Sequence, residues 1–469
     1  MTNSESKKSI EYASFFDYLE MMNLKYDVKT IENFLLSIKA KQFLILSGPS
    51  GTGKTKIAQA YGQYISQVDS KPIIVKDETP VDNADSRGGH LSIRDKAALF
   101  NALPRDVDNT DSKEYYFTLG NVRTRGKLTL TPRISPSIDK EKVIAEIKRL
   151  KETIPDDPNY PKKKKYAKLY IEIPAPTNRP EKCYTVVPVG PNWNERRFIL
   201  GYRNPVTKEY VSNPCYDILC SASMRKDVTH LLVLDEMNIS YVERYFADIL
   251  SAMESHESIE LEDDVHTKLM IDENMIIIGT VNQDETTYAF SPKVLDRANV
   301  IEFKSASIDD VFSTSIQNEK PTGDVEFLDN ANNYTLIRRK TSSVIIREIN
   351  SVKENKSILE ELKSDLAAIQ SKLDEIGFSF GYRTIDELMR FMYAAWCYER
   401  NGTFSNWKRY FDTQILQKIL PKIHGNLSIR QTLIDLKDFC KKKEYCDTAK
   451  KLKHMIKVLE DQRYVSFNC

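Results

Sequence analysis

The sequence predicts an α/β fold in which helices cover a parallel β-sheet, with a mixed α+β insertion and a helical C-terminal segment. Three observations predict it. Short apolar runs at 43–46, 229–234 and 275–281 are typical of buried strands of a parallel sheet. Apolar residues spaced three and four apart after the first run indicate an amphipathic helix over 57–68. A glycine-rich segment, residues 48–55, joins that strand to that helix.

The glycine-rich segment reads Gly-Pro-Ser-Gly-Thr-Gly-Lys-Thr and matches the phosphate-binding P-loop pattern GxxxxGK[ST]. Backbone N–H groups of such a loop converge on a phosphate, and the helix dipole favours negative charge there. The predicted nucleotide-binding residues are Gly48, Pro49, Ser50, Gly51, Thr52, Gly53, Lys54 and Thr55. Lys54 would bridge the β- and γ-phosphates and Thr55 would help to hold Mg²⁺. The sequence therefore predicts that the protein binds ATP or GTP.

The composition limits the class of protein. The 469 residues carry 68 Lys and Arg against 67 Asp and Glu, so no overall basic charge indicates nucleic acid, although local patches still can. No run approaches about 18 apolar residues, so we expect no transmembrane helix. The polar N-terminus lacks the apolar core of a secretion signal, and the seven cysteines form no CxxC pair. We expect a cytoplasmic protein with free thiols.

An acidic pair follows the second predicted strand. Residues 229–234, Thr-His-Leu-Leu-Val-Leu, lead into Asp235 and Glu236. Ligands of open α/β sheets bind at the carboxyl ends of the strands, so this pair is expected beside the P-loop. In P-loop enzymes the pair is the Walker B element. Asp235 would hold Mg²⁺ together with Thr55, and Glu236 would orient or deprotonate the attacking water.

A polar residue also ends the third predicted strand. Asn282 follows the apolar run 275–281 and is expected at the same edge of the sheet as Asp235. There it would lie close enough to a bound triphosphate to contact it. The alternative is a turn-forming asparagine in the sequence Asn-Gln-Asp, which is a common use of this residue.

Two arginines stand next to predicted elements. Arg297 precedes a predicted strand at 300–303, and the alternative to a catalytic role is an ion pair with its neighbour Asp296. Arg383 lies at the mouth of an amphipathic helix for which Thr384 is the predicted N-cap. The alternative for Arg383 is an ordinary surface arginine.

These residues together resemble one branch of the AAA+ NTPases, the McrB family of motor subunits of McrBC-type modification-dependent restriction complexes. The resemblance runs from about residue 30 to residue 425, apart from an insertion. The Walker motifs are generic, whereas Asn-x-Asp-Glu-Thr-Thr joined to Ser-Pro-Lys-Val-Leu-Asp-Arg is considerably more specific. The segments that carry the resemblance are 46–55, 201–211, 234–238, 279–287, 290–297 and 415–425.

The resemblance implies an AAA+ P-loop NTPase core within a ring of identical subunits, a hexamer with nucleotide between neighbours. Asn282 would contact the γ-phosphate or the water, Arg297 would be an arginine finger reaching the next subunit's nucleotide, and Arg383 would bind nucleotide from the lid. The implied catalytic residues are Lys54, Glu236, Asn282 and Arg297. The implied organisation is an N-terminal helical segment (1–40), the core (41–70 and 183–310), an insertion (71–182), and a lid with a basic tail (311–469).

The resemblance also implies DNA and a separate nuclease subunit as partners, because this sequence carries no nuclease signature. Two departures from the founding members matter. Their Met-Asn-x-x-Asp motif, associated with GTP, reads here Val281-Asn282-Gln283-Asp284-Glu285, which leaves ATP and GTP both open. Their N-terminal domain reads modified cytosine, and the roughly 40 residues before the first strand are too few for such a domain.

Residues 71–182 are expected to form the inserted module, because a connection between helix and strand needs only about two to six residues. Its basic loop, Lys162–Lys165, has Tyr160, Tyr166 and Tyr170 beside it, and these would track a nucleic-acid backbone and stack bases. The alternative is a solvated lysine loop on a structural or subunit-contact module. The expected elements are strands at 115–119, 127–131 and 169–173 and a charged helix over 139–153.

The C-terminal segment is expected to be helical. Residues 355–376 form an amphipathic helix whose apolar positions are too few for a coiled coil, so we expect it to pack within the lid or on the core. The lysine-rich stretch 441–453 is expected to be a basic helix that contacts DNA or a partner, or else a solvated helix face.

Three classes of function are compatible with these motifs and with the family resemblance. The leading hypothesis is an ATP- or GTP-hydrolysing ring, the motor of an anti-phage restriction system that moves or remodels DNA for a separate nuclease. The second is a MoxR- or midasin-like AAA+ protein that remodels protein complexes. The third is a nucleotide-gated signalling scaffold with slow turnover.

Overall fold

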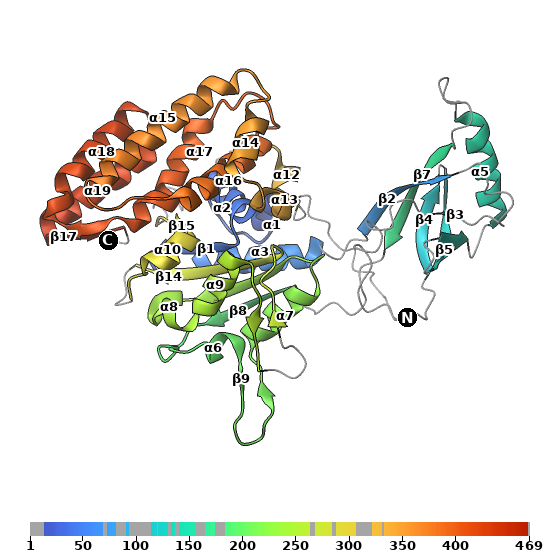
Figure 1. Ribbon diagram of the computed structural model, residues 1–469, viewed down its shortest axis with the longest axis horizontal. Helices are drawn as coiled ribbons and strands as arrows, with labels where there is room; N and C mark the ends of the chain where they lie inside the picture. Colours follow the sequence, from blue (N-terminus) through green and yellow to red (C-terminus); the bar gives the residue numbers. More distant parts are fainter. Residues whose placement is uncertain are drawn as a thin grey trace, which may run out of the picture. The chain divides into compact units, whose positions relative to one another are not determined.

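The chain divides into two compact units, residues 1–65 with 183–469 and residues 66–182 (Figure 1). The second unit covers nearly the same residues as the expected insertion, 71–182. The computed structural model describes residues 14–68, 73–80, 91–92, 114–119, 121–129, 133–136, 140–154, 165–173, 183–262, 268–283, 288–305, 321–330 and 333–467.

The first unit is built on a five-stranded parallel sheet, which confirms the predicted α/β fold. The side chains of β1, β11 and β14 are buried almost throughout, as expected when helices cover both faces of a sheet. Since β14 pairs with both β1 and β11, its carboxyl end lies between theirs. The strands are, in spatial order, β15 (Asn299–Glu302), β1 (Phe43–Gly48), β14 (Met275–Asn282), β11 (His230–Asp235) and β8 (Tyr184–Pro188).

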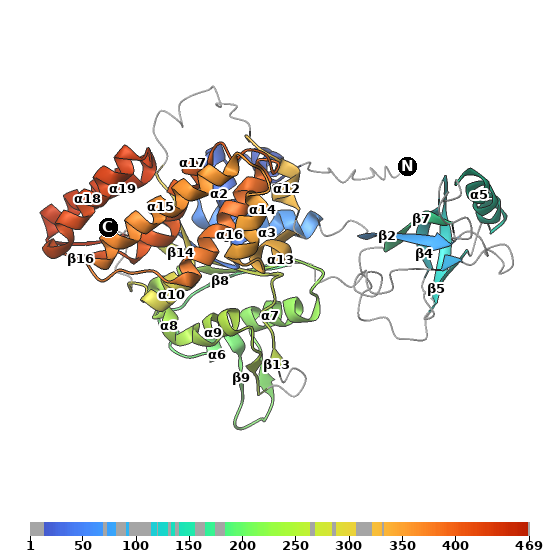
Figure 2. The same cartoon turned by 45° about the horizontal axis from the view of Figure 1, so that its top comes forward.

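Helices lie on both sides of this sheet, with α2 on one side and α7 and α9 on the other (Figures 1 and 2). Asp27 caps α2 by accepting a hydrogen bond from the backbone N–H of Thr30 at 2.8 Å. Asn213 caps α7 in the same way, and Pro214 follows at the first helical position. These helices are α2 (Val28–Ala40), α3 (Lys54–Val68), α7 (Pro214–Met224) and α9 (Ala247–Ser255).

Shorter elements complete the core. The hairpin of β9 and β10 projects from it (Figure 2). The short helices are α1 (Phe15–Met21), α6 (Arg197–Leu200), the 3₁₀ turn η2 (Met237–Ile239), α8 (Val242–Tyr245) and α10 (Pro292–Arg297). The short strands are β9 (Tyr202–Arg203), β10 (Tyr210–Val211), β12 (Ile259–Glu260) and β13 (Lys268–Leu269).

The C-terminal segment is helical, as predicted, and packs on α2 through α16. Its helices are α12 (Val325–Asp329), α13 (Asn333–Arg338), α14 (Ser342–Ile349), α15 (Asn355–Asp374), α16 (Tyr382–Tyr398), α17 (Trp407–Gln414), α18 (Arg430–Lys442) and α19 (Cys446–Gln462). A π-helical stretch η3 (Ile415–Ile419) and 3₁₀ turns η4 (Leu420–Lys422) and η5 (Leu427–Ile429) join α17 to α18. Two short strands, β16 (His424–Asn426) and β17 (Tyr464–Ser466), pair antiparallel.

Two local expectations for this segment need correction. Gly381, not Thr384, takes the N-cap position of α16, and Thr384 is a buried residue of the first turn whose hydroxyl accepts a hydrogen bond from Lys422. The lysine-rich stretch 441–453 is only partly solvated. Its Lys451 is buried, because the side chain crosses to the sheet instead of pointing into water. Among the described residues, no helix is both long and apolar enough to cross a membrane.

The second unit is a six-stranded antiparallel sheet with one described helix, α5 (Lys140–Thr153). Buried residues of α5 include Val143 and Ile147, and Glu146 accepts from the backbone N–H of Asn121 at 2.9 Å. Tyr160 and Lys162–Lys164 lie outside the described residues. The strands, in spatial order, are β2 (Ile73–Pro80), β7 (Tyr166–Ile173), β4 (Glu114–Leu119), β5 (Val122–Thr129), β6 (Arg133–Pro136) and β3 (Leu91–Ser92).

Candidate nucleotide site

The P-loop lies where β1 ends and α3 begins. Gly48, Gly51 and Gly53 have φ angles of +152°, +78° and +86°, a region that favours glycine. A Cβ on Gly48 would lie 2.3 Å from the carbonyl oxygen of Phe303, and one on Gly53 would lie 2.6 Å from the hydroxyl of Tyr26. Tyr26 also donates a hydrogen bond to the Gly53 carbonyl at 2.8 Å. Glycine is therefore required by backbone angle and, at two positions, by close neighbours.

Lys54 is buried against its own loop. Its Nζ donates to the carbonyl oxygens of Gly48 at 2.8 Å and Pro49 at 2.6 Å. The Thr52 hydroxyl donates to the same Pro49 carbonyl at 2.9 Å, which ties the two ends of the turn together. The ammonium group is thus held inside the curve of the loop, where a P-loop places the phosphates of its nucleotide.

Asp235 joins the P-loop helix to the central strands. Its Oδ1 accepts hydrogen bonds from the hydroxyls of Thr55 and Thr280, each at 2.6 Å. A hydroxyl and a carboxylate are the hard oxygen donors that suit Mg²⁺, which typically takes one or two carboxylates and completes its shell with water and substrate phosphates. The described residues contain no cluster of three or more His, Cys, Asp or Glu side chains with metal-binding geometry. The Thr55 hydroxyl and the Asp235 carboxylate are the oxygen donors here that could hold Mg²⁺.

Glu236 has a left-handed backbone, with φ of 55° and ψ of 47°, although it is not a glycine. Its backbone N–H donates to the Thr280 hydroxyl at 3.0 Å, and its Oε1 accepts from the Asn282 amide at 3.2 Å. A non-glycine residue keeps such a backbone conformation only where the surrounding structure imposes it, and such residues are common at functional sites. The hydroxyl of Thr280 therefore hydrogen-bonds to both members of the acidic pair, to the side chain of Asp235 and to the backbone N–H of Glu236.

Sequence reasoning missed Thr280. The signal that could have found it is a hydroxyl residue two positions before Asn282 in an otherwise apolar strand, because positions two apart in a strand point to the same face. The structure therefore groups Lys54, Thr55, Asp235, Glu236 and Asn282 as predicted for one site, with Thr280 as an added member.

A second group reaches the same edge of the sheet from the C-terminal helices. The backbone N–H of Gln283 donates to the Gly48 carbonyl at 3.2 Å, and its side-chain amide donates to the Ser47 hydroxyl at 3.2 Å. Glu302, at the carboxyl end of β15, accepts from Gln283 at 3.5 Å and from Lys451 of α19 at 2.6 Å. The last helix of the chain is thus linked by polar contacts to the residues that precede the P-loop.

The structure places Arg297 at the opposite edge of the sheet from the P-loop. β15 runs parallel to β1 with Asn299 beside Leu44, so Arg297 lies beyond the amino end of the sheet. Gly48 is four residues beyond Leu44 on β1, about 13 Å farther along the strand direction at 3.3 Å per residue. Arg297 pairs with Glu254, not with its neighbour Asp296, whose carboxylate pairs with Lys422. The alternative ion pair considered from sequence therefore involves a different partner.

Arg383 lies with Arg297 and not with the P-loop of its own chain. Its side chain is 45% exposed, and its guanidinium group pairs with Glu254 as well. Burial lowers the pKa of Lys41, which precedes β1; Glu387 raises that pKa, and Arg390 and Arg383 lower it. Arg383 is therefore close to the amino end of β1, whereas the P-loop follows the carboxyl end.

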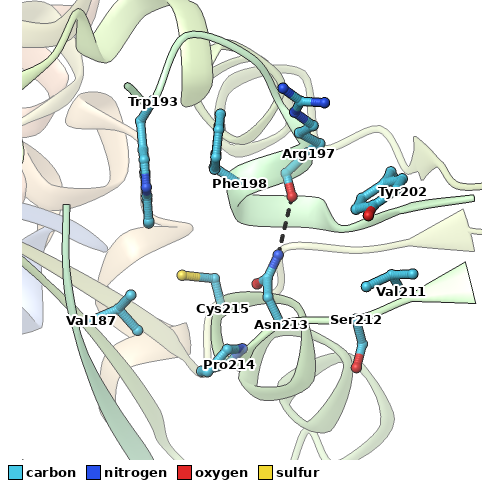
Figure 3. A pocket seen from close by; sticks show the side chains of 10 residues that line it. All are labelled: Val187, Trp193, Arg197, Phe198, Tyr202, Val211, Ser212, Asn213, Pro214 and Cys215. Carbon is cyan, nitrogen blue, oxygen red and sulfur yellow. Dashed lines mark hydrogen bonds between the residues drawn. The ribbon is translucent and has the colours of Figure 1, made fainter. Parts of the chain in front are cut away.

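A pocket of about 410 Å³ lies beside the carboxyl end of β8 (Figure 3). Trp193 stacks on Phe198 with ring centroids 5.5 Å apart, and the Trp193 carbonyl accepts from the Ser240 hydroxyl in the turn after the acidic pair. The pocket contains none of the predicted nucleotide-binding residues. Its lining is Val187, Trp193, Arg197, Phe198, Tyr202, Val211, Ser212, Asn213, Pro214 and Cys215.

A comparison with known protein families matches the C-terminal helices. Residues 336–464 match a family described as a domain of unknown function (DUF8727). The match starts within α13 and ends at the first residue of β17, so it includes Arg383 and Lys451 but no residue of the P-loop or the acidic pair. No curated protein matches the chain.

Proposed function

We propose that this protein is a Mg²⁺-dependent nucleoside triphosphatase of the AAA+ type that works as a ring of identical subunits. The observation that carries the proposal is the 2.6 Å hydrogen bond from Thr55 of the P-loop to Asp235 of the acidic pair. Two motifs that are far apart in the sequence meet there, and Glu236 and Asn282 lie beside them. Generic P-loop chemistry needs that arrangement.

Each residue has a defined task in this proposal. Backbone N–H groups of the loop and the ammonium of Lys54 bind the β- and γ-phosphates. Mg²⁺, when bound beside Thr55 and Asp235, neutralises charge on those phosphates. Glu236 accepts a proton from the attacking water, and Asn282 holds the Glu236 carboxylate in place at 3.2 Å. The left-handed backbone of Glu236 fixes the direction of its side chain.

Two features support the AAA+ assignment. A strand, β14, separates the P-loop strand from the acidic strand and carries Asn282 at its tip, as in the AAA+ core that the sequence resembles. Arg297 is the last residue of helix α10, beyond the amino end of the sheet and away from its own P-loop. If Arg297 contacts a nucleotide, that nucleotide is held by another copy, so hydrolysis would need a composite site with Arg297 of the next subunit in a homo-oligomer, a hexameric ring by the same resemblance.

The resemblance to McrB subunits supports a more specific role. We infer that the ring acts on DNA together with a separate nuclease subunit in an anti-phage restriction system. Two of the segments that carry the resemblance form local structures: residues 201–211 form the projecting β9–β10 hairpin, and residues 290–297 contain α10. ATP and GTP are both candidate substrates.

The test uses the purified full chain. Phosphate release from ATP and from GTP is measured with Mg²⁺ over a range of protein concentrations, with and without DNA, while mass photometry reports assembly. We expect hydrolysis per subunit to rise as rings form, and salt-sensitive DNA binding. A monomer that hydrolyses neither nucleotide would contradict the proposal. Hydrolysis without DNA binding at low salt would instead favour a protein-remodelling ATPase.

A further inference from the structure

Arg297 and Arg383 meet at a single carboxylate. One terminal nitrogen of Arg297 pairs with Oε2 of Glu254, and one of Arg383 pairs with Oε1. Glu254 lies in the last turn of α9 and its side chain is 32% exposed, so the cluster is open to solvent. The other two nitrogens of Arg297, Nε and Nη1, donate to the carbonyls of Leu250 at 3.2 Å and Lys293 at 2.9 Å.

A contact other than Glu254 also joins the two arginine-bearing segments. Lys422 pairs with the carboxylate of Asp296, the residue before Arg297. The same ammonium group donates to the hydroxyl of Thr384, the residue after Arg383, at 3.1 Å. One lysine of η4 therefore fixes the spacing between the two arginine-bearing segments.

A second lysine holds the Arg297 backbone from within the C-terminal helices. Lys418 is fully buried, and its Nζ donates to the carbonyls of Asp296 at 2.6 Å and Ala298 at 3.0 Å, on either side of Arg297. It also forms an ion pair with the buried Glu387. Because buried ionic contacts of this kind are costly to break, the arginine pair is held rigidly.

Two guanidinium groups that converge on the two oxygens of one carboxylate can converge equally on two oxygens of one phosphate. Guanidinium N–H groups form charge-assisted hydrogen bonds with the oxygens of a planar carboxylate and with those of a tetrahedral phosphate. Glu254 prevents this in the free chain in two ways. It occupies one donor of each arginine, and its negative charge repels a phosphate.

We propose that Arg297 and Arg383 act together as one phosphate clamp for the nucleotide of a second copy, and that Glu254 closes this clamp until a terminal phosphate displaces it. The inference rests on the proposed function and adds to it a positioning residue, Glu254, and a joint role for Arg383. The exchange is a change of ion-pair partner and involves no covalent step. Glu254 would thereby set the protein concentration at which rings become active.

The first experiment compares Glu254→Gln with wild type in steady-state hydrolysis over a range of protein concentrations. We expect the concentration for half-maximal activity to fall by about tenfold, a typical coupling between linked sites. Glu257→Gln, which removes an exposed carboxylate three residues away, is the control and should leave the curve unchanged. Glu254→Asp, which keeps the charge, should stay closer to wild type than Glu254→Gln.

The second experiment separates the clamp from the nucleotide pocket by mixing two variants. Lys54→Ala chains provide the arginines, and Arg297→Ala chains provide the bound nucleotide. We expect the mixture to hydrolyse nucleotide, and to do so at a lower concentration when the Lys54→Ala chain also carries Glu254→Gln. An unchanged concentration dependence for Glu254→Gln, or loss of hydrolysis equal to that of Arg297→Ala, would overturn the inference while leaving the NTPase assignment intact. An inert wild type would overturn both.

Discussion

Thr55 and Asp235 are joined by a hydrogen bond of 2.6 Å although 180 residues separate them in the chain. The intervening chain includes the whole second unit and still leaves these two side chains in contact. The contact forms because the P-loop helix begins, and β11 ends, at the carboxyl edge of one sheet. The hydrogen bond places the Thr55 hydroxyl and the Asp235 carboxylate side by side, where both could bind one metal ion.

This contact predicts the effect of removing the Asp235 charge. Asp235→Asn keeps an oxygen that can accept from Thr55 and Thr280, so the fold should persist. We expect the apparent affinity for Mg²⁺ in hydrolysis to fall by about 10- to 100-fold. Nucleotide binding in EDTA should change little. Magnesium titration of the hydrolysis rate measures this, with Asp227→Asn as the control; an unchanged magnesium dependence would contradict the assignment.

The left-handed backbone of Glu236 predicts an unusual order of stability between two variants. Glu236→Gly and Glu236→Ala both remove the carboxylate, but only alanine keeps a Cβ at φ of 55°. We expect the glycine variant to be more stable than the alanine variant by about 1 kcal/mol, because the left-handed region costs residues with a Cβ about that much. Urea denaturation measures the free energy of unfolding of both. A more stable alanine variant would show that the backbone there is unstrained.

The P-loop glycines provide a second matched comparison. A methyl group on Gly48 would meet the backbone carbonyl of Phe303 at 2.3 Å, whereas one on Gly51 would meet no atom within 4 Å. Both residues have positive φ, so both substitutions carry the cost of a left-handed alanine. We expect Gly48→Ala to lower the free energy of unfolding by about 1–3 kcal/mol more than Gly51→Ala, the usual cost of overpacking. Equal losses in chemical denaturation would argue against this packing.

His230 predicts a pH dependence of stability. It is fully buried at the start of β11, and burial lowers its pKa to about 4 from an ordinary value of 6.5. The unfolded chain therefore takes up a proton as the pH falls below 6.5, while the folded chain does so only near pH 4. The stability due to the neutral ring is present above pH 6.5 and is lost on the way down to pH 4, by about 3 kcal/mol at 1.4 kcal/mol per pKa unit.

The measurement is the free energy of unfolding at pH 7 and at pH 4 for wild type and His230→Gln. We expect the decrease between these two pH values to be smaller in the variant by about 3 kcal/mol. His454→Gln, at an exposed position of α19, is the control. Identical decreases in wild type and His230→Gln would contradict the role assigned to the buried ring.

The parts of the fold that depend on a local sequence pattern could be predicted from the sequence. The short apolar runs ending at Leu46, Leu234 and Val281 are typical of central strands of a parallel sheet. Glycine, lysine and threonine at fixed spacing predicted a P-loop, since few other structures need that pattern. The acidic pair could be placed beside it because strands of a parallel sheet end at a common edge.

Contacts between residues that are far apart in the sequence could not be predicted. The contacts of Thr280 with the acidic pair depend on the pairing of β14 with β11, and the contact of Lys451 with Glu302 depends on how α19 packs. The position of Arg383 depends on how the C-terminal helices pack on α2, which no local pattern encodes. Glu254 was indistinguishable in sequence from any other glutamate near the end of a helix.

The central claim is that the Thr55–Asp235 site hydrolyses a nucleoside triphosphate with Glu236 as the base. The most direct measurement is single-turnover hydrolysis of ATP and of GTP with Mg²⁺ by wild type and by Glu236→Gln, alongside nucleotide binding by each. We expect unchanged binding and a rate lower by about 10²- to 10⁴-fold in the variant. Equal hydrolysis rates in the two proteins, or no nucleotide binding by wild type, would contradict it.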